Sequence, residues 1–424
     1  MGGEAIGKTR DLWLVYFYAP PEDSSLETLL PRILLGVLLT AGKVVEAFAD
    51  PFIGFWSDRT RSRWGRRIPF VLAATPPWAL LSFLVFTPPG DAGTATTALY
   101  FFVVSEIFFF CASLSGGPYE ALLPEIAPTS GERVTVQSFK VYLGVLGGAI
   151  GLVGSDLLKD AFGFRTMALC IAVFALACRY AGIAGVWRRA ARPTAPAVIS
   201  FREAMRVTFS NRSFLLFLPT FVLFQIGFTM LIGVLPYYHD AILGDGTWLK
   251  VRVLAAIAIV SAVVTVPLFG ALARRTSKRQ AYRVAMLGAA ATFPLIALAG
   301  LVPGIPVEAQ IMVAVALAGI PVGGNYLFPA TLTADIIDED SGQTGLRREA
   351  TYYGAQNFVE KLASSLAPLF LILLLLFGDS AGNSLGIRLI GPVAGLIVFC
   401  AYLIFRSYSL EDQVEARVEP GPTA

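Results

Sequence analysis

The stretch KVVEAFADPFIGFWSDRTRSRWGRR, residues 43–67, decides the fold class of this 424-residue chain. It places Lys43, Glu46 and Asp50 inside an otherwise apolar helix and ends that helix in a basic hairpin. On a helix, residues 46 and 50 lie one turn apart on the same face. Acidic residues inside a membrane are costly, so they usually face a bundle interior and mark an ion or substrate path. The pair therefore predicts a cation site. Simple neutralisation of Glu46 by Lys43 between helices is the alternative.

The composition is that of a membrane protein. Hydrophobic residues make up 55% of the chain and charged residues 15%. Apolar runs such as residues 68–86 and 251–273 are as long as the roughly 20 residues that span a bilayer. The sequence has no phosphate loop, no clustered metal ligands and no nucleophile–base pair, and its single histidine stands at a membrane boundary. We therefore expect an all-α polytopic membrane protein that is not an enzyme.

The apolar runs predict twelve helices, one of them partial. Residues 12–20 (LWLVYFYAP) are too few to cross a bilayer alone, so we expect a truncated first helix. A signal peptide is the alternative, but no small-x-small cleavage site follows this run. The eleven full-length spans are expected at residues 29–57, 68–87, 97–123, 137–158, 164–187, 213–237, 249–273, 282–302, 308–334, 350–377 and 385–406.

Basic residues set the expected orientation. Lys and Arg cluster at residues 59–67, 188–212 and 274–283, which are on every second connection. By the positive-inside rule, these connections are cytoplasmic. We therefore expect a multi-pass protein of the inner cell membrane with both termini in the cytoplasm. The net charge of +3 reflects this asymmetry and does not indicate nucleic-acid binding.

An internal repeat predicts two halves. The basic hairpin GFWSDRTRSRWGRR (residues 54–67) has a counterpart in GALARRTSKR (residues 270–279), at the corresponding place in the second half. A six-plus-six arrangement is a transporter architecture whose site lies between the halves near mid-membrane. The expected parts are a six-helix bundle at residues 1–187 with a partial first helix, a cytoplasmic linker at 188–212, a second six-helix bundle at 213–407 and a cytoplasmic tail at 408–424.

The basic hairpin also carries a motif. Its pattern of Gly-x-x-x-Asp-Arg followed by Gly-Arg-Arg resembles the cytoplasmic loop signature of the major facilitator superfamily. The resemblance implies a conformational latch in which Asp58, Arg59, Arg66 and Arg67 bridge neighbouring helix ends and hold one alternating-access state closed. Arginines that only anchor the topology are the alternative, so the specific hypothesis rests on Asp58.

Three segments point to a narrower family. They are EAFADPFIGFWSDRTRSRWGRRIPF (46–70), PYEALLPEIAPTSGERVTVQSFK (118–140) and TADIIDEDSGQTGLRREATYYGAQNFVEKLASS (333–365). Together they resemble the glycoside–pentoside–hexuronide:cation symporter family, over nearly the whole chain in order and spacing. The Thr-Gly-x-Arg-Arg-Glu run before a membrane helix is the most specific part. Asp335 and Arg348 of the third segment are expected to join the latch.

The resemblance sharpens the cation site. In family members, two carboxylates at the positions of Glu46 and Asp50 contribute to that site, and here the first is Glu in place of Asp. The hydroxyls of Ser113 and Ser115, on the span at residues 97–123, can add neutral oxygens for Na⁺. A proton needs only one carboxylate. The coupling ion therefore stays open between Na⁺ and H⁺, and no other cofactor is expected.

A second group of residues is expected in the substrate cavity with Lys43. Lys361 matches a lysine in the family's eleventh helix. A local pair with Glu360 is the alternative, although sequence neighbours point about 100° apart on a helix. Lys140 corresponds approximately to a basic residue after the fourth helix. Tyr119 is one of several aromatic residues that can stack on a sugar ring, and packing in the core or against lipid is the alternative for it.

The expected function is secondary active transport. We expect symport of a sugar or glycoside-like solute with Na⁺ or H⁺ by alternating access, by a monomer in the lipid bilayer. Two departures from the family pattern weaken galactoside recognition: a sugar-binding aspartate falls at Gly116, and another belongs to the first helix, most of which is missing. A carrier for a lysolipid or another amphiphilic or drug-like solute is one alternative. A truncated, non-transporting membrane protein is the other.

Overall fold

The computed structural model describes most of the chain as helix, and the described residues contain no strand. Its description leaves out residues 61, 63, 66, 91–92, 121, 123–125, 127–129, 191–208, 245, 345–348 and 409–424. Within helices it also leaves out the side chains of residues 43–52, 54–55, 58–59, 130–135, 137–138, 141, 188–190, 344, 349–351, 354 and 362–364.

The described helices follow the predicted spans closely. In chain order they are α1 (Gly2–Tyr18), α2 (Arg32–Arg59), α3 (Ile68–Leu84), α4 (Thr94–Glu120), α6 (Ser130–Ala149), α7 (Ser155–Ala190), α9 (Arg212–Tyr238), α10 (Val251–Arg275), α11 (Lys278–Thr292), α12 (Val307–Thr344), α13 (Glu349–Ser364), α14 (Leu366–Leu375) and α15 (Leu385–Phe405). Short π-helical turns at Ile150–Gly154 and His239–Leu243 and a 3₁₀ segment at Phe293–Leu298 extend three of them.

Length and hydropathy confirm a polytopic membrane fold. Among the described residues, 8 helical runs are long and apolar enough to cross a membrane. One of these, Tyr142–Trp187, covers two predicted spans. A kink in α7 at Gly163, where φ is +79°, separates the two. The shorter apolar helices Arg32–Gly42 and Ile68–Leu84 correspond to the two remaining spans. The helices thus account for all eleven predicted full-length spans.

The first helix differs from the prediction. The sequence run at residues 12–20 predicts a short helix, but α1 is 17 residues long and begins at Gly2. It includes Arg10, which is only 8% exposed and has its guanidinium 4.0 Å from the ring centroid of Phe108. A hydropathy profile misses residues 2–11 because Lys8 and Arg10 count as polar. In the fold, aromatic rings cover Arg10 and attract its charge through their electron-rich faces.

Glycines let α1 approach the α6 helix closely. A Cβ atom added at Gly147 would lie 2.2 Å from the carbonyl oxygen of Met1, and one at Gly151 would lie 2.5 Å from that of Ala5. Small residues at such spacing allow membrane helices to pack backbone against backbone. Thr9 then donates its hydroxyl to the Gly151 carbonyl at 3.2 Å. The helix is therefore an integral part of the bundle.

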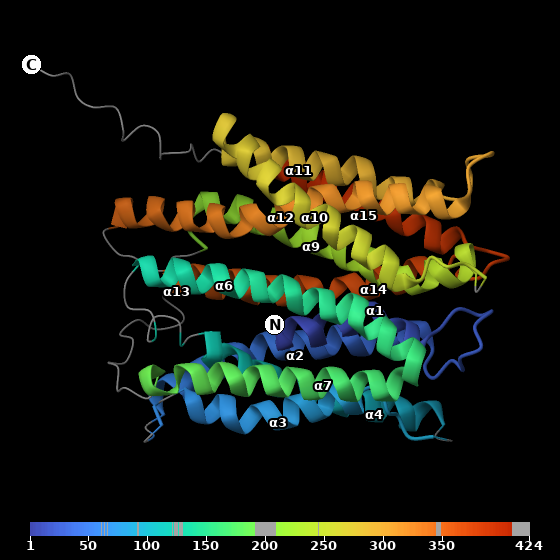
Figure 1. Cartoon of the computed structure of the whole chain (residues 1–424). Helices are drawn as coiled ribbons and strands as arrows, with labels where there is room; N and C mark the ends of the chain where they lie inside the picture. The colour runs from blue at the N-terminus through green and yellow to red at the C-terminus, as the bar shows by residue number, and fades with distance from the viewer. Residues whose placement is uncertain are drawn as a thin grey trace, which may run out of the picture. The chain divides into compact units, whose positions relative to one another are not determined.

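Contacts divide the chain into two compact units. Unit 1 comprises Met1–Ser200, Thr229–Ala256 and Lys361–Ile390, and unit 2 comprises the rest. In unit 1, α4 packs against both α2 and α3, and α7 packs against α1 and α3, as the lower part of Figure 1 shows. In unit 2, α11 packs along α12. These units group segments by contact, so the predicted boundaries of the two six-helix bundles stay a prediction.

Candidate functional site

The α2 helix, which holds the predicted cation-site acids, is contacted by two other segments of unit 1. Residues 46 and 50 belong to α2, and the helical backbone puts them one turn apart on one face. Earlier on the same helix, the Thr40 hydroxyl lies 3.4 Å from the carbonyl oxygen of Ser365, which follows α13. The α4 helix also packs against α2. The side chains of Lys43, Glu46 and Asp50 lie outside the described residues.

Two predicted site residues, Ser113 and Lys361, are in contact with each other. Ser113 of α4 is 2% exposed, and Lys361 of α13 donates from Nζ to its Oγ at 3.4 Å. This distance is at the long end of the hydrogen-bond range, so the contact itself is weak. The contact nevertheless shows that the two residues, 248 positions apart in sequence, are neighbours in the fold. A lysine ammonium thus lies beside a hydroxyl oxygen that is predicted as a possible Na⁺ ligand.

Glu360 has a different partner from Lys361. Gln225 of α9 donates its amide to Glu360 Oε1 at 3.3 Å, and Asn325 of α12 donates to Gln225 Oε1 at 3.1 Å. Tyr282 of α11 extends this chain by donating its hydroxyl to Asn325 Oδ1 at 3.3 Å. All four side chains belong to unit 2. Interhelical amide bonds of this kind satisfy polar groups that lipid cannot.

A third acid lies close to α2 and was not assigned a role from the sequence. Glu106 of α4 has carboxylate oxygens that solvent does not reach. A Cβ atom added at Gly42 would lie 3.0 Å from Glu106 Oε1, so the carboxylate lies directly against α2. Residue 42 is one turn before Glu46, and Glu106 is two turns before Ser113 on one face of α4. Buried intramembrane acids are usually functional, which was the available signal.

Two other residues of α4 face elsewhere. Ser115 is fully buried and shares a 3.0 Å hydrogen bond with the hydroxyl of Thr75 on α3. Tyr119 packs beside the buried cluster of Ile68, Val71, Leu122 and Ile183, and the Arg179 guanidinium lies 4.5 Å from its ring centroid. Ser115 and Tyr119 therefore take part in packing against α3 and α7. The expected substrate role of Tyr119 stays a prediction.

Lys140 lies on the surface of unit 1. Its ammonium forms an ion pair with Glu120, and the two side chains are 54% and 51% exposed. Surface ion pairs contribute little to stability, about 0–1 kcal/mol. The structure thus places Lys140 beside Glu120, at the end of α4, and does not bring it to Ser113.

The predicted latch is described in part. Arg67 precedes α3 and is 9% exposed. Asp335 of α12 accepts from Lys278 Nζ with both carboxylate oxygens, at 2.8 and 2.7 Å. Lys278 belongs to the repeat of the basic hairpin, at the start of α11. The side chains of Asp58, Arg59, Arg66 and Arg348 lie outside the described residues, so the structure does not place them.

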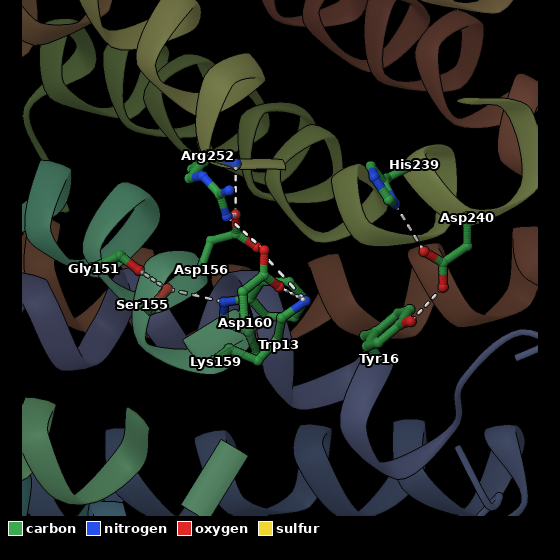
Figure 2. A network of polar contacts seen from close by, with 10 residues as sticks. All are labelled: Trp13, Tyr16, Gly151, Ser155, Asp156, Lys159, Asp160, His239, Asp240 and Arg252. Carbon is green, nitrogen blue, oxygen red and sulfur yellow. Dashed lines mark hydrogen bonds and ion pairs between the residues drawn. The ribbon is translucent and has the colours of Figure 1, made fainter. Parts of the chain in front are cut away.

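Sequence reasoning missed a polar network at the other end of unit 1, far from the basic hairpin. Asp156, at the start of α7, is buried and accepts from both the backbone N–H and Nη1 of Arg252, each at 3.1 Å. Arg252 also donates to Asp160 at 2.5 Å, and Lys159 lies 3.0 Å from Asp160 (Figure 2). Burial raises the pKa of Asp160, but hydrogen bonds and charges from Lys159 and Arg252 outweigh this and hold it below its ordinary value.

Further polar contacts occur at this end. Tyr16 donates its hydroxyl to Asp240, whose other oxygen lies 3.0 Å from His239 Nδ1 (Figure 2). Arg32, the first residue of α2, forms an ion pair with Asp379, which is 2% exposed. Burial raises the pKa of the Asp379 carboxyl above its ordinary value, although Arg32 lowers it. Single charges at the ends of spans gave no signal in the sequence, because each is ordinary until its partner is known.

The chain matches one family model over most of its length. Residues 4–386 match the family described as MFS/sugar transport protein. The chain is 23% identical over 364 residues to the isoprimeverose transporter of Lactiplantibacillus pentosus, covering 82% of this chain and 74% of that protein. It is also 23% identical over 431 residues to the sodium-dependent lysophosphatidylcholine symporter 1-A of Danio rerio, covering 89% and 79%. An uncharacterized symporter of Synechocystis is 34% identical over 129 residues, 29% of this chain and 24% of that protein.

Solved structures share the fold at low identity. The nucleoside transporter NupG superimposes with a TM-score of 0.63 at 12% identity, covering 96% of this chain and 98% of that chain. A bacterial homologue of the human drug peptide transporters gives a TM-score of 0.65 at 10% identity, covering 96% and 95%. The helical arrangement is therefore one that membrane transporters with very different sequences also adopt.

Proposed function

Because the chain belongs to the MFS/sugar transport protein family, it is a multi-pass membrane transporter and not an enzyme, and we propose that it carries a sugar or glycoside-like solute together with Na⁺ or H⁺. The observation that carries the coupling proposal is the contact between Lys361 and Ser113 of α4, a helix that packs against α2. The α2 helix holds the candidate acids Glu46 and Asp50.

Charge balance supplies the coupling mechanism. Adjacent carboxylates repel each other in a low-dielectric site, and a bound cation relieves this repulsion. We propose that Glu46 and Asp50 hold the cation with the Ser113 hydroxyl, while the ammonium of Lys361 offsets their charge when the carrier is empty. An ion that favours one conformation changes the affinity for the solute by the same factor, and the reverse also holds.

Names of relatives support a glycoside as the solute. Relatives covering most of this chain include the isoprimeverose transporter and a glucuronide carrier protein homolog of Escherichia coli, the latter 25% identical over 348 residues. A lysolipid is the second candidate, because the lysophosphatidylcholine symporter of Danio rerio covers 89% of the chain at equal identity. Gly116 has no side-chain carboxylate to accept from sugar hydroxyls, so we propose that recognition differs from the galactoside mode of the family.

Topology and closure form a further part of the proposal. The clustered Lys and Arg residues favour an inner-membrane protein with the hairpin at residues 59–67 and both termini in the cytoplasm. In the second half, the Lys278–Asp335 bridge between α11 and α12 supports a latch role for the repeated basic turn. We propose that Asp58 with Arg59, Arg66, Arg67 and Arg348 acts likewise in a carrier that functions as a monomer.

Uptake by reconstituted protein tests the function. Purified protein in proteoliposomes is given labelled glycosides, pentosides, glucuronides or lysophosphatidylcholine, each with a Na⁺ gradient, a pH gradient or neither. We expect uptake of a glycoside that one of the two gradients accelerates. Accumulation of the lysolipid alone would favour the second candidate. Absence of gradient-driven uptake for every solute, with intact folded protein, would contradict symport.

A further inference from the structure

Asp156 forms a buried ion pair, unlike the exposed ion pairs found on protein surfaces. Its carboxylate is 2% exposed and receives two hydrogen bonds from Arg252, one from the backbone N–H and one from the guanidinium. The two residues are 96 positions apart, so the contact joins the end of the predicted span at residues 137–158 to the start of the span at 249–273. Buried, charge-assisted contacts of this type hold their partners in one defined geometry.

Neighbouring groups extend the contact across unit 1. Asp160 accepts from the same Arg252 Nη1, and Lys159 lies 3.7 Å from Asp156 and 3.0 Å from Asp160. The Lys159 ammonium also lies 4.4 Å from the ring centroid of Trp13, and Trp13 Nε1 donates to Ser155 Oγ at 2.9 Å. Figure 2 shows these side chains gathered from α1, α7 and the start of α10. Two acids and two bases thus balance in one network.

Two further polar contacts, referred to below as ties, connect helices at the same end. Tyr16 of α1 is bonded to Asp240, which follows α9, and Arg32 of α2 is paired with Asp379, which follows α14. Each tie joins the predicted first bundle, residues 1–187, to a part of the predicted second bundle that belongs to unit 1. Since α2 has 28 residues, Arg32 is about 42 Å from the basic hairpin along the helix, at 1.5 Å per residue.

We propose that Arg252, with Asp156 and Asp160, is a latch that closes the end of unit 1 remote from the basic hairpin, and that opening to this side requires its rupture. The idea rests on the proposed alternating-access function, for which the sequence assigns a latch only at the hairpin end. Arg252 is a positioning residue in this account: it holds helix ends together and contacts neither solute nor coupling ion.

A cysteine introduced at a buried position reports on the latch without any solute. Ser155 is fully buried, next to Asp156, and cysteine has nearly the same shape. Ser155→Cys is placed in a background whose native cysteines, Cys111, Cys170, Cys178 and Cys400, are replaced by alanine. The rate of maleimide labelling is measured on purified protein in detergent, so that the reagent reaches both ends of the protein and the result does not depend on how the protein is oriented in a membrane. Ser62→Cys, at an exposed position, serves as the reactive reference.

Four backgrounds separate the latch from general damage. The parent is compared with Arg252→Ala, with Arg252→Ala plus Asp156→Asn, and with Arg165→Gln, an exposed arginine near the same end. Arg252→Ala alone leaves Asp156 buried without its guanidinium, which destabilises a fold. The double variant removes that buried charge and still lacks the latch.

The outcomes are distinct. We expect labelling of Ser155→Cys to be at least about tenfold faster in both Arg252→Ala backgrounds, a population shift worth ~1.4 kcal/mol, and unchanged in Arg165→Gln. Return of the double variant to the parent rate would show that the buried charge, and not the open end, exposed the introduced thiol, and this would overturn the latch. Equal rates in all backgrounds would overturn it as well. Failure of glycoside uptake would contradict the proposed function alone, because labelling needs no transport.

Discussion

The ion pair of Lys278 with Asp335 offers a quantitative test of the idea that charges bridge helix ends. Lys278 Nζ lies 2.8 and 2.7 Å from the two carboxylate oxygens, and the side chains are 29% and 22% exposed. Lys278 opens α11, where a lone cation opposes the helix dipole. Asp335 offsets this unfavourable charge and ties α11 to α12.

The magnitude follows from distance and exposure. Unit charges about 3 Å apart attract by ~1.4 kcal/mol in water and ~5.5 kcal/mol at an effective dielectric constant of 20. Because both side chains are partly exposed, screening and side-chain entropy reduce the upper figure. We expect a coupling free energy of about 1–2 kcal/mol, above the range of about 0–1 kcal/mol for exposed pairs.

A double-mutant cycle measures this coupling. Lys278→Met, Asp335→Asn and the double variant are unfolded by titrating SDS into mixed micelles at low and high salt. The cycle of Lys140→Met with Glu120→Gln is the control, because that pair is more than half exposed. We expect the larger coupling for Lys278 and a decrease with salt. A coupling below about 0.3 kcal/mol, within the error of additivity, would refute the reasoning.

Three further predictions follow from other contacts. Gly151→Val should lower the thermal unfolding temperature strongly, because its Cβ would meet Ala5 at 2.5 Å, whereas Gly185→Val, which meets nothing within 4 Å, should change it little; similar losses would contradict the close approach of α1. Because the pKa of Asp160 is lowered in the fold, the unfolded chain is protonated at Asp160 before the folded chain as pH falls. Its contribution to stability is thus full above the ordinary value of 3.8 and is lost as pH falls through the lower folded-state pKa, and this acid limb, measured by unfolding at a series of pH values, should be absent in Asp160→Asn. Ser113→Ala should raise the ion concentration for half-maximal uptake about tenfold, whereas Ser115→Ala, which loses its bond to Thr75, should leave it unchanged; equal ion dependence in both variants would remove Ser113 from the site.

Hydropathy predicts the spans well, because a bilayer imposes a strict length of apolar residues on every helix. It does not predict the start of α1, since Lys8 and Arg10 read as polar. Their helix is nevertheless part of the bundle: Lys8 pairs with Asp11, and Arg10 is covered by Phe108 and Phe109. Contacts made in the folded protein therefore allow these charged residues to lie within a helix that their local sequence does not predict.

The candidate site was predictable only in part. Ser113 and Lys361 were both expected at a site, and the structure brings them together although a hydropathy profile says nothing of pairing. Tyr119 was chosen as one of several aromatic residues that can stack on a sugar ring, but in the structure its ring lies against Arg179 and a buried apolar cluster, a contact that the sequence does not indicate. The contact of Arg252 with Asp156 joins distant segments, and a single sequence carries no signal of that pairing.

Ion-driven uptake by Asp50→Asn is the most direct test of the central claim, that Glu46 and Asp50 couple a cation to solute movement. Wild type, Asp50→Asn, Glu46→Gln and the loop control Glu27→Gln are reconstituted, and solute uptake is measured with and without the driving gradient. We expect Glu27→Gln to behave as wild type. Asp50→Asn should lose gradient-driven accumulation while still exchanging solute down its own gradient. Normal ion-driven accumulation by Asp50→Asn would contradict the account.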